Sequence, residues 1–264
     1  MKRSSRARTG AAATVSVLSL ALVTGCGGGS GADSGKAAAS PSTGTGTSAA
    51  TAPAAKARSA AELEKLLLAK GDVAGYDVDP GDDTLPKGKS AVKADRSACA
   101  PLAYAISGLP PADTEASANN TVTSQTSTPS PGALDEASVE GAFDIDMTIV
   151  GLSSYEGDGA EKAVEAVSDG IAACSGGFGI AAEGENLKIT KVAAGKASGK
   201  GDQSVAFAVS SDMDGEGTAG FTVDVVRVGS TVSTYYTVDF ASLGSGKAAT
   251  VPAAVLEAQV AKLT

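Results

Sequence analysis

The second half of the chain contains runs in which apolar and polar residues alternate, and these runs predict β-strands. In residues 142–151 the apolar side consists of Phe143, Ile145, Met147 and Ile149. A period of two is typical of a strand with one buried and one wet face. Four further strands are predicted at residues 187–192, 204–210, 220–228 and 231–240. The last two flank Gly229-Ser230, and this two-residue loop predicts a hairpin.

Other segments repeat their apolar residues with the period of an α-helix. In residues 59–69, Ser59 and Glu62 have the spacing of a capping box, and Gly71 ends the helix. Residues 159–174 form a second helix, whose apolar stripe ends at Cys174. A third begins near Pro252, with Thr250 as its cap. Its stripe consists of Val255, Leu256, Gln259, Val260 and Leu263.

The remaining folded segments give weaker patterns. A short helix is expected at residues 99–106 and one weak strand at 120–127. The glycine-rich residues 176–179 are interpreted as a helix stop and a loop. Together these elements predict an α+β domain over residues 59–264, in which an antiparallel sheet of about five or six strands is packed on one face by two to three helices.

The N-terminus has the pattern of a secretory signal. A basic start with no acid precedes an apolar run at residues 11–23, and Val23-Thr24-Gly25-Cys26 closes it. This ending resembles a bacterial lipoprotein signal. The resemblance implies that residues 1–25 are removed and that Cys26 carries acyl chains such as palmitate. An ordinary cleaved signal is the alternative. The apolar run is shorter than the roughly 20 residues that span a bilayer.

Residues 26–58 consist largely of Gly, Ser, Ala, Thr and Pro. Such a composition buries too little apolar surface to offset the entropy of ordering. A disordered tether is therefore expected, with a mean span of about 30 Å. It would join a lipid anchor on the extracytoplasmic face of the cell membrane to the folded domain.

The charge and composition exclude several functions. The net charge of the 264 residues is −9, and removal of the signal, with four bases and no acid, takes it to −13. Nucleic acid is therefore not an expected partner. The chain has no His, which removes the commonest general base and most zinc sites. We expect no cofactor and no enzyme activity. A hydrolase that uses carboxylates, such as the paired Asp144 and Asp146, is an alternative.

Two cysteines remain for the folded domain. In an exported chain Cys99 and Cys174 most simply form one disulfide. Closing the loop between residues 99 and 174 would stabilise the domain by about 4–5 kcal/mol. A reactive thiol or a metal-binding pair is the alternative.

The order of motifs in the folded part resembles that of actinobacterial cell-envelope lipoproteins with a PknH-like extracellular sensor domain. The motifs are LLLAKGDVAGYDV, Cys99, FDIDMTIVGLSSYEG, AEKAVEAVSDGIAAC, GDQSVAFAV and VVRVGSTVSTYYTVDF. The resemblance implies a sheet packed by helices, with a cleft for an unknown extracellular ligand. Kinase sensor domains of this type carry two disulfides, whereas one pair of cysteines is present here. The 264 residues include no kinase domain, so a signalling output would need a partner protein.

Two further groups of residues are candidates for binding. Arg227 and Tyr235 could hold a ligand if the second face of the sheet is open, with an ordinary surface ion pair as the alternative for Arg227. Asp212 and Asp214, followed by Gly215, resemble the front of a calcium loop. An Asp-Gly hairpin turn is the alternative there.

The function expected from these observations is that of a lipid-anchored, non-catalytic binding module for an unknown small molecule. A structural protein that docks on another envelope protein is the alternative. The shape of the surface distinguishes the two, because an apolar cleft favours a ligand and a flat exposed apolar patch favours a protein partner.

Overall fold

The computed structural model describes residues 56–264 apart from 81–84, 115, 126–144, 183, 214 and 216. Within these ranges the strands form one ten-stranded sheet in the order β1-β3-β4-β9-β8-β7-β6-β5-β2, with β10 beside β8. Neighbouring strands are antiparallel except β10, which runs parallel to β8. The α+β class and the antiparallel sheet are confirmed, whereas five or six strands were too few.

The strands are β1 Tyr76–Asp79, β2 Val92–Ala94, β3 Ala116–Ser124, β4 Asp146–Ser154, β5 Phe178–Ala182, β6 Glu185–Ala194, β7 Gln203–Asp212, β8 Thr218–Val228, β9 Thr231–Asp239 and β10 Ser245–Ala248. The α-helices are α1 Ala60–Leu66, α2 Ala100–Ile106, α4 Gly159–Ala173 and α5 Ala253–Leu263. Short 3-10 turns are η1 Lys89–Ala91, η2 Ser97–Cys99 and η3 Phe240–Ser242.

The strands that the sequence analysis missed are the short ones. β1, β2, β5 and β10 have three to five residues each, too few to show a clear alternation. The loop expected at residues 176–179 is wrong in its second half. Gly177 turns the chain with a φ of +89°, and Phe178 already begins β5 beside β6.

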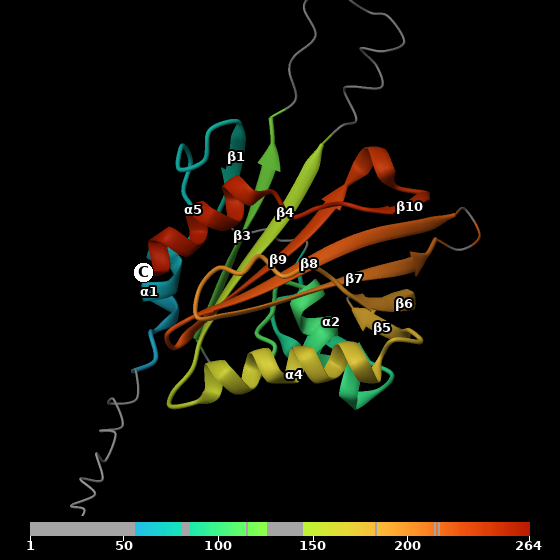
Figure 1. The fold of residues 1–264 in the computed structure, drawn as a ribbon, viewed down its shortest axis with the longest axis horizontal. Coiled ribbons are helices and arrows are strands. Elements are labelled where there is room, and N and C mark those ends of the chain that lie inside the picture. The colour runs from blue at the N-terminus through green and yellow to red at the C-terminus, as the bar shows by residue number, and fades with distance from the viewer. Residues whose placement is uncertain are drawn as a thin grey trace, which may run out of the picture. The chain divides into compact units, whose positions relative to one another are not determined.

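Helices cover both faces of the sheet, which corrects the prediction of one covered face (Figure 1). Helices α2 and α4 pack on one face, here called the front face, and α1 and α5 pack on the other, the back face. Thr148, expected on a wet face, is completely buried on the back face. Its hydroxyl lies 3.0 Å from that of Thr237, also completely buried. The second face is thus dry because α1 and α5 cover it, and the buried Thr148 and Thr237 hydroxyls pair with each other beneath them.

Helix α1 ends at Leu66, before the predicted end at residue 69. The capping contact at its start is present, because the Ser59 N–H donates to the Glu62 carboxylate over 2.8 Å. At its end, the side chain of Gln259 in α5 bonds the backbone groups that a further helical turn would use. Its Nε2 donates to Leu66 O over 2.8 Å, and its Oε1 accepts from Leu68 N over 3.1 Å. These tertiary bonds replace the last turn of the helix.

The front face is closed by a covalent link. Cys99 and Cys174 form the expected disulfide, with 5.9 Å between their Cα atoms. It joins η2, at the start of α2, to the residue that follows α4. The apolar stripe of α4 is buried as the sequence predicted. The disulfide therefore fixes the two front helices to each other.

Candidate functional site

The front helices stop partway along the strands. Helix α2 ends at Ile106, and the turn at Gly108 lies directly on β4. Gly108 has a φ of +66°, and a Cβ added there would come 2.7 Å from Ile149 Cγ2. This close contact needs glycine both for its backbone conformation and for its lack of a side chain. Beyond the end of α2, the front face carries two adjoining pockets.

The first pocket has a volume of about 550 Å³ and lies between α2, β4, β9 and the β5–β6 hairpin. Its apolar lining includes Leu85, Ile106, Ile149, Ile180, Leu187 and Tyr236. The second has about 520 Å³, and its apolar lining is Leu187, Met213, Ala219, Phe221 and Leu243. Asn186 and Leu187 line both. We call the two pockets together the front cleft. Each falls within the size range of small-molecule sites.

The polar groups of the front cleft are few and carry no positive charge. Among the described lining residues the charged ones are Glu185 and Asp212, and no Lys or Arg is present. Tyr236 packs its ring against Phe221, with 5.4 Å between the ring centroids. Burial raises the pKa of Tyr236, so its hydroxyl remains a neutral donor. The cleft therefore suits an apolar ligand with a neutral or cationic polar group.

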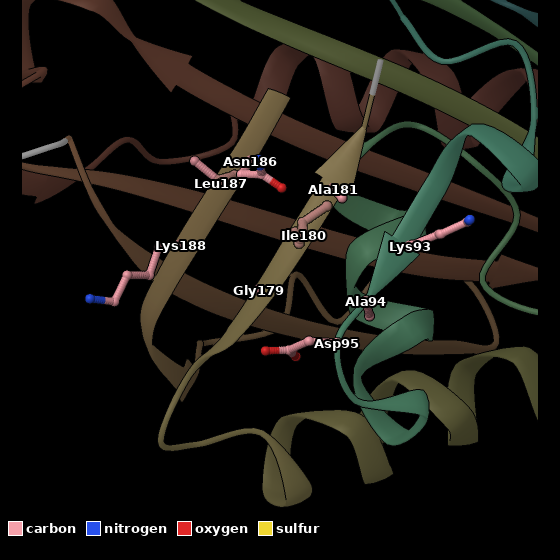
Figure 2. Close-up of a pocket in the computed structure, with 9 residues that line it drawn as sticks. All are labelled: Lys93, Ala94, Asp95, Gly179, Ile180, Ala181, Asn186, Leu187 and Lys188. Carbon is pink, nitrogen blue, oxygen red and sulfur yellow. The ribbon is translucent and has the colours of Figure 1, made fainter. Parts of the chain in front are cut away.

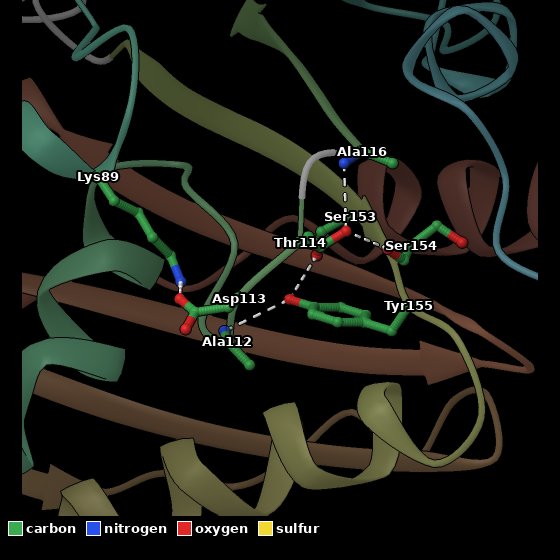
Figure 3. A network of polar contacts seen from close by, with 8 residues as sticks. All are labelled: Lys89, Ala112, Asp113, Thr114, Ala116, Ser153, Ser154 and Tyr155. Atoms are coloured by element: carbon green, nitrogen blue, oxygen red, sulfur yellow. Dashed lines mark hydrogen bonds and ion pairs between the residues drawn. The ribbon is translucent and has the colours of Figure 1, made fainter.

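One wall of the front cleft is fixed by Lys89. Its Nζ lies 2.9 Å from Asp113 Oδ1 and 4.7 Å from the centroid of the Tyr104 ring. Figure 3 shows the ion pair beside the end of β4, where the Tyr155 hydroxyl accepts from Ala112 N and from Ser153 Oγ. Lys89 thereby holds the segment that brings Leu85 and Pro86 across the sheet.

The lip of the front cleft is unusually apolar. Phe240 and Leu243, in and beside η3, are 43% and 37% exposed. They are the large apolar side chains that stand open to solvent in the described part of the chain. Leu243 also lines the second pocket. Exposed apolar surface beside an apolar pocket is typical of a binding site.

A smaller pocket of about 390 Å³ lies at the β2–β5–β6 edge (Figure 2). It shares Ile180, Asn186 and Leu187 with the front cleft. Figure 2 shows Lys93 and Lys188 pointing away from each other. The two cations therefore do not converge on one ligand, and this edge pocket is not the candidate site.

Arg227 and Tyr235 lie on opposite faces of the sheet, so the prediction that they share an open ligand surface is corrected. Tyr235 is completely buried on the back face. Arg227 is on the front side and donates from Nε to Gln203 over 2.7 Å. It also forms an ion pair with Asp202 at 3.3 Å. The contacts of Arg227 agree with the ordinary ion-pair alternative.

Asp212 forms contacts typical of a hairpin turn. Its Oδ1 accepts from Gly215 N over 3.3 Å, and its Oδ2 lies 3.9 Å from Lys188 Nζ. Asp214 lies outside the described residues. Across the residues that the structure describes, no three His, Cys, Asp or Glu side chains gather as a metal site. The contacts of Asp212 agree with the turn alternative, and the calcium loop, which also needs Asp214, stays a prediction.

Several predictions concern residues outside the described ranges. These are the signal at residues 1–25, the lipidated Cys26, most of the tether, and Asp144 of the carboxylate pair. Among the described helices, none combines the length and apolar character needed to cross a bilayer.

The comparisons with known proteins find similarity among solved structures. No family model and no curated protein sequence matches the chain. Among solved structures, the extracellular domain of PknH from Mycobacterium tuberculosis matches with a TM-score of 0.46 and 13% sequence identity. The match covers 79% of this chain and 95% of that domain. A similarity this distant carries no conclusion about function.

The sequence analysis interpreted most front-cleft residues as ordinary core. Ile149 and Tyr236 lie on the apolar side of their strands, which is the same signal that a fully covered core gives. No short-range pattern in the sequence distinguishes a residue that lines a pocket from one in a covered core.

Proposed function

We propose that the folded part is an extracytoplasmic binding module that holds an elongated apolar ligand in the front cleft. The observation that carries this proposal is that two apolar pockets, about 550 and 520 Å³, adjoin at their shared lining residues Asn186 and Leu187. Tyr236 lines the first pocket, and its hydroxyl can donate a hydrogen bond to a polar group of the ligand. The acids Glu185 and Asp212 disfavour an anionic one.

A non-catalytic role is part of the same proposal. A chain without His lacks the usual general base, and the front cleft offers a neutral tyrosine and separated acids instead. The PknH-like sequence motifs led to the same expectation of a sensor-like module.

The test uses N-phenylnaphthylamine, a neutral apolar fluorophore that brightens in a dry site. Leu187→Arg places a charge in the wall that both pockets share, so we expect binding to weaken tenfold or more. Thr190→Arg, on the exposed side of the same strand, is the matched control and should bind as the wild type does. Equal binding by Leu187→Arg and the wild type, with both folded, would overturn the proposal.

Docking on another envelope protein is a second candidate, favoured by the exposure of Phe240 and Leu243. A photo-crosslinker at position 240 should then capture one specific partner in membranes, and the same group at the exposed Lys191 should not. Capture of the same proteins from both positions would argue against this function.

We further propose that acyl chains on Cys26 anchor the module to the membrane. The basis is the lipoprotein-like sequence around Cys26. The intact mass of membrane-extracted protein should show an N-terminal lipidated Cys26, and Cys26→Ser should lack the modification. An unmodified Cys26 in the wild type would contradict this part of the proposal.

A further inference from the structure

The back face carries a separate pocket of about 750 Å³, larger than either pocket of the front cleft. It lies where the end of α1 meets β1, β3 and the end of α5. Leu67, Leu68 and Val78 form its apolar wall. We call it the back pocket. It shares no lining residue with the front cleft.

A buried amide with a free acceptor lines the back pocket. Asn120 is 1% exposed, and its Nδ2 donates to Leu68 O over 2.7 Å. Its Oδ1 has no hydrogen-bond partner among the residues that the structure describes. The nearby backbone cannot supply one from Leu68, because Leu68 N already donates to Gln259. A hydroxyl or N–H of a ligand would satisfy this oxygen, and buried polar atoms are normally satisfied.

The charge of the back pocket is opposite to that of the front cleft. Its lining contains Lys65, Lys70 and Lys262 and one acid, Glu64. Lys262 pairs with Asp72 at 2.6 Å. Lys65 and Lys70 have no salt-bridge partner within the described ranges. A net positive rim on a chain of net charge −9 selects for an anion.

We propose that the back pocket binds an anionic amphiphile that also carries a hydrogen-bond donor. The apolar chain would lie against Leu67, Leu68 and Val78, and the carboxylate or phosphate would lie at Lys65 and Lys70. The donor would reach Asn120 Oδ1. A hydroxylated fatty acid has all three features. This site is independent of the front cleft, so either proposal can fail without the other.

The probe is β-hydroxydodecanoate, titrated calorimetrically into the purified full-length chain below its micelle concentration. Lys65→Gln/Lys70→Gln removes both unpaired cations from the exposed rim and should weaken binding about tenfold. Lys93→Gln/Lys188→Gln makes the same charge change at the β2–β6 edge and should leave binding unchanged. Equal affinity in the two double variants would overturn the site.

A second variant tests the cavity itself. Ala69→Phe fills the back pocket from its lining and leaves the backbone bond from Ala69 N to Asp72 in place. It should abolish binding of the probe, whereas N-phenylnaphthylamine binding in the front cleft should persist.

Three further ligands distinguish the contribution of the charged head group to binding from that of the apolar chain. Dodecyl phosphate should bind in a lysine-dependent way. Dodecyltrimethylammonium suits the acidic front cleft instead, so its binding should be the same in the wild type and in Lys65→Gln/Lys70→Gln. Inorganic phosphate alone should not bind measurably. Lysine-dependent binding of inorganic phosphate with the same affinity as the amphiphiles would overturn the proposal, because the apolar wall would then contribute nothing.

Discussion

The two faces of the sheet are covered in different ways. On the front face, a disulfide joins the helices, and the contacts with the sheet are mostly apolar. On the back face, buried polar side chains such as Gln259 and Asn120 bind the backbone of the covering segment. The two helices joined by the disulfide leave part of the front face to the front cleft, whereas polar side chains fix the covering segment of the back face residue by residue. The front cleft and the back pocket follow from this difference.

The charges of the two pockets differ in the same way. The front cleft has acids and no base among its described lining residues, and the back pocket has three lysines. If both proposals hold, the back pocket selects an anionic ligand and the front cleft disfavours one. Variants that affect one face and spare the other test whether this division is real.

The largest expected effect comes from the disulfide. Replacing Cys99 and Cys174 by Ala should lower the free energy of unfolding by about 4–5 kcal/mol. The loss should appear in urea unfolding of the variant and in wild type that has been reduced. Cys26→Ser is the matched control and should change stability little. A loss below about 1 kcal/mol would show that apolar packing alone holds α2 and α4.

Gln259→Leu should have the next largest effect, on the back face. It leaves Leu66 O and Leu68 N without their partner, and each buried unsatisfied group costs about 1–3 kcal/mol. We expect a loss of about 3–4 kcal/mol in urea unfolding. N-phenylnaphthylamine binding at the front cleft should be unchanged in the folded variant. A concurrent loss of that binding would show that the two faces are coupled.

The back face also holds Asp224, the one charged residue that is buried in the described part of the chain. Burial raises its pKa to about 6, and Ser198 Oγ, which donates to Oδ1 over 3.2 Å, opposes the rise. The folded state therefore binds the proton more tightly than the unfolded state does. Asp224 should reduce the free energy of unfolding as the pH rises from about 4 to about 6, by about 2–3 kcal/mol in total.

Asp224→Asn should remove this dependence. The variant should be more stable than wild type by about 2–3 kcal/mol at pH 7 and equal to it near pH 4. Comparing the two chains at each pH cancels the opposite contributions of exposed acids such as Glu62 and Asp72, whose pKa values are lowered. A constant difference between pH 4 and pH 7 would contradict the assignment.

The elements that the sequence predicted well carry their own periodic pattern. Helix α4 and the β8–β9 hairpin need only local information, namely an apolar stripe and a Gly-Ser turn. The second covered face could not be predicted in this way. Thr148 and Tyr235 have the polar character of a wet face. The helices above make that face dry, and Thr148 also pairs with the distant Thr237. The end of α1 was missed for the same reason, because Gln259 lies far away in the sequence.

Of the candidate sites, the disulfide followed from cysteine count alone, whereas the front cleft did not follow from any motif. Leu187 and Tyr236 give the signal of core residues, and their position beyond the end of α2 decides that they line a pocket. The back pocket depends on Asn120 and on lysines from α1 and α5. Their proximity is a property of the chain path, which no short-range pattern encodes.

The smallest expected effect concerns the ion pair between Lys200 and Glu257, which joins the β6–β7 loop to α5 at 2.9 Å. Their side chains are 46% and 56% exposed, so water and salt screen the attraction. Lys200→Gln should cost about 0.5 kcal/mol or less, and a double-mutant cycle with Glu257→Gln should give a coupling of the same size that vanishes at high salt. A coupling above about 1 kcal/mol that persists in salt would show that surface charge helps to attach α5 to the sheet. The expected small value means that Gln259 and the apolar stripe attach α5 to the sheet. Buried polar contacts then remain the feature that distinguishes the back face from the front.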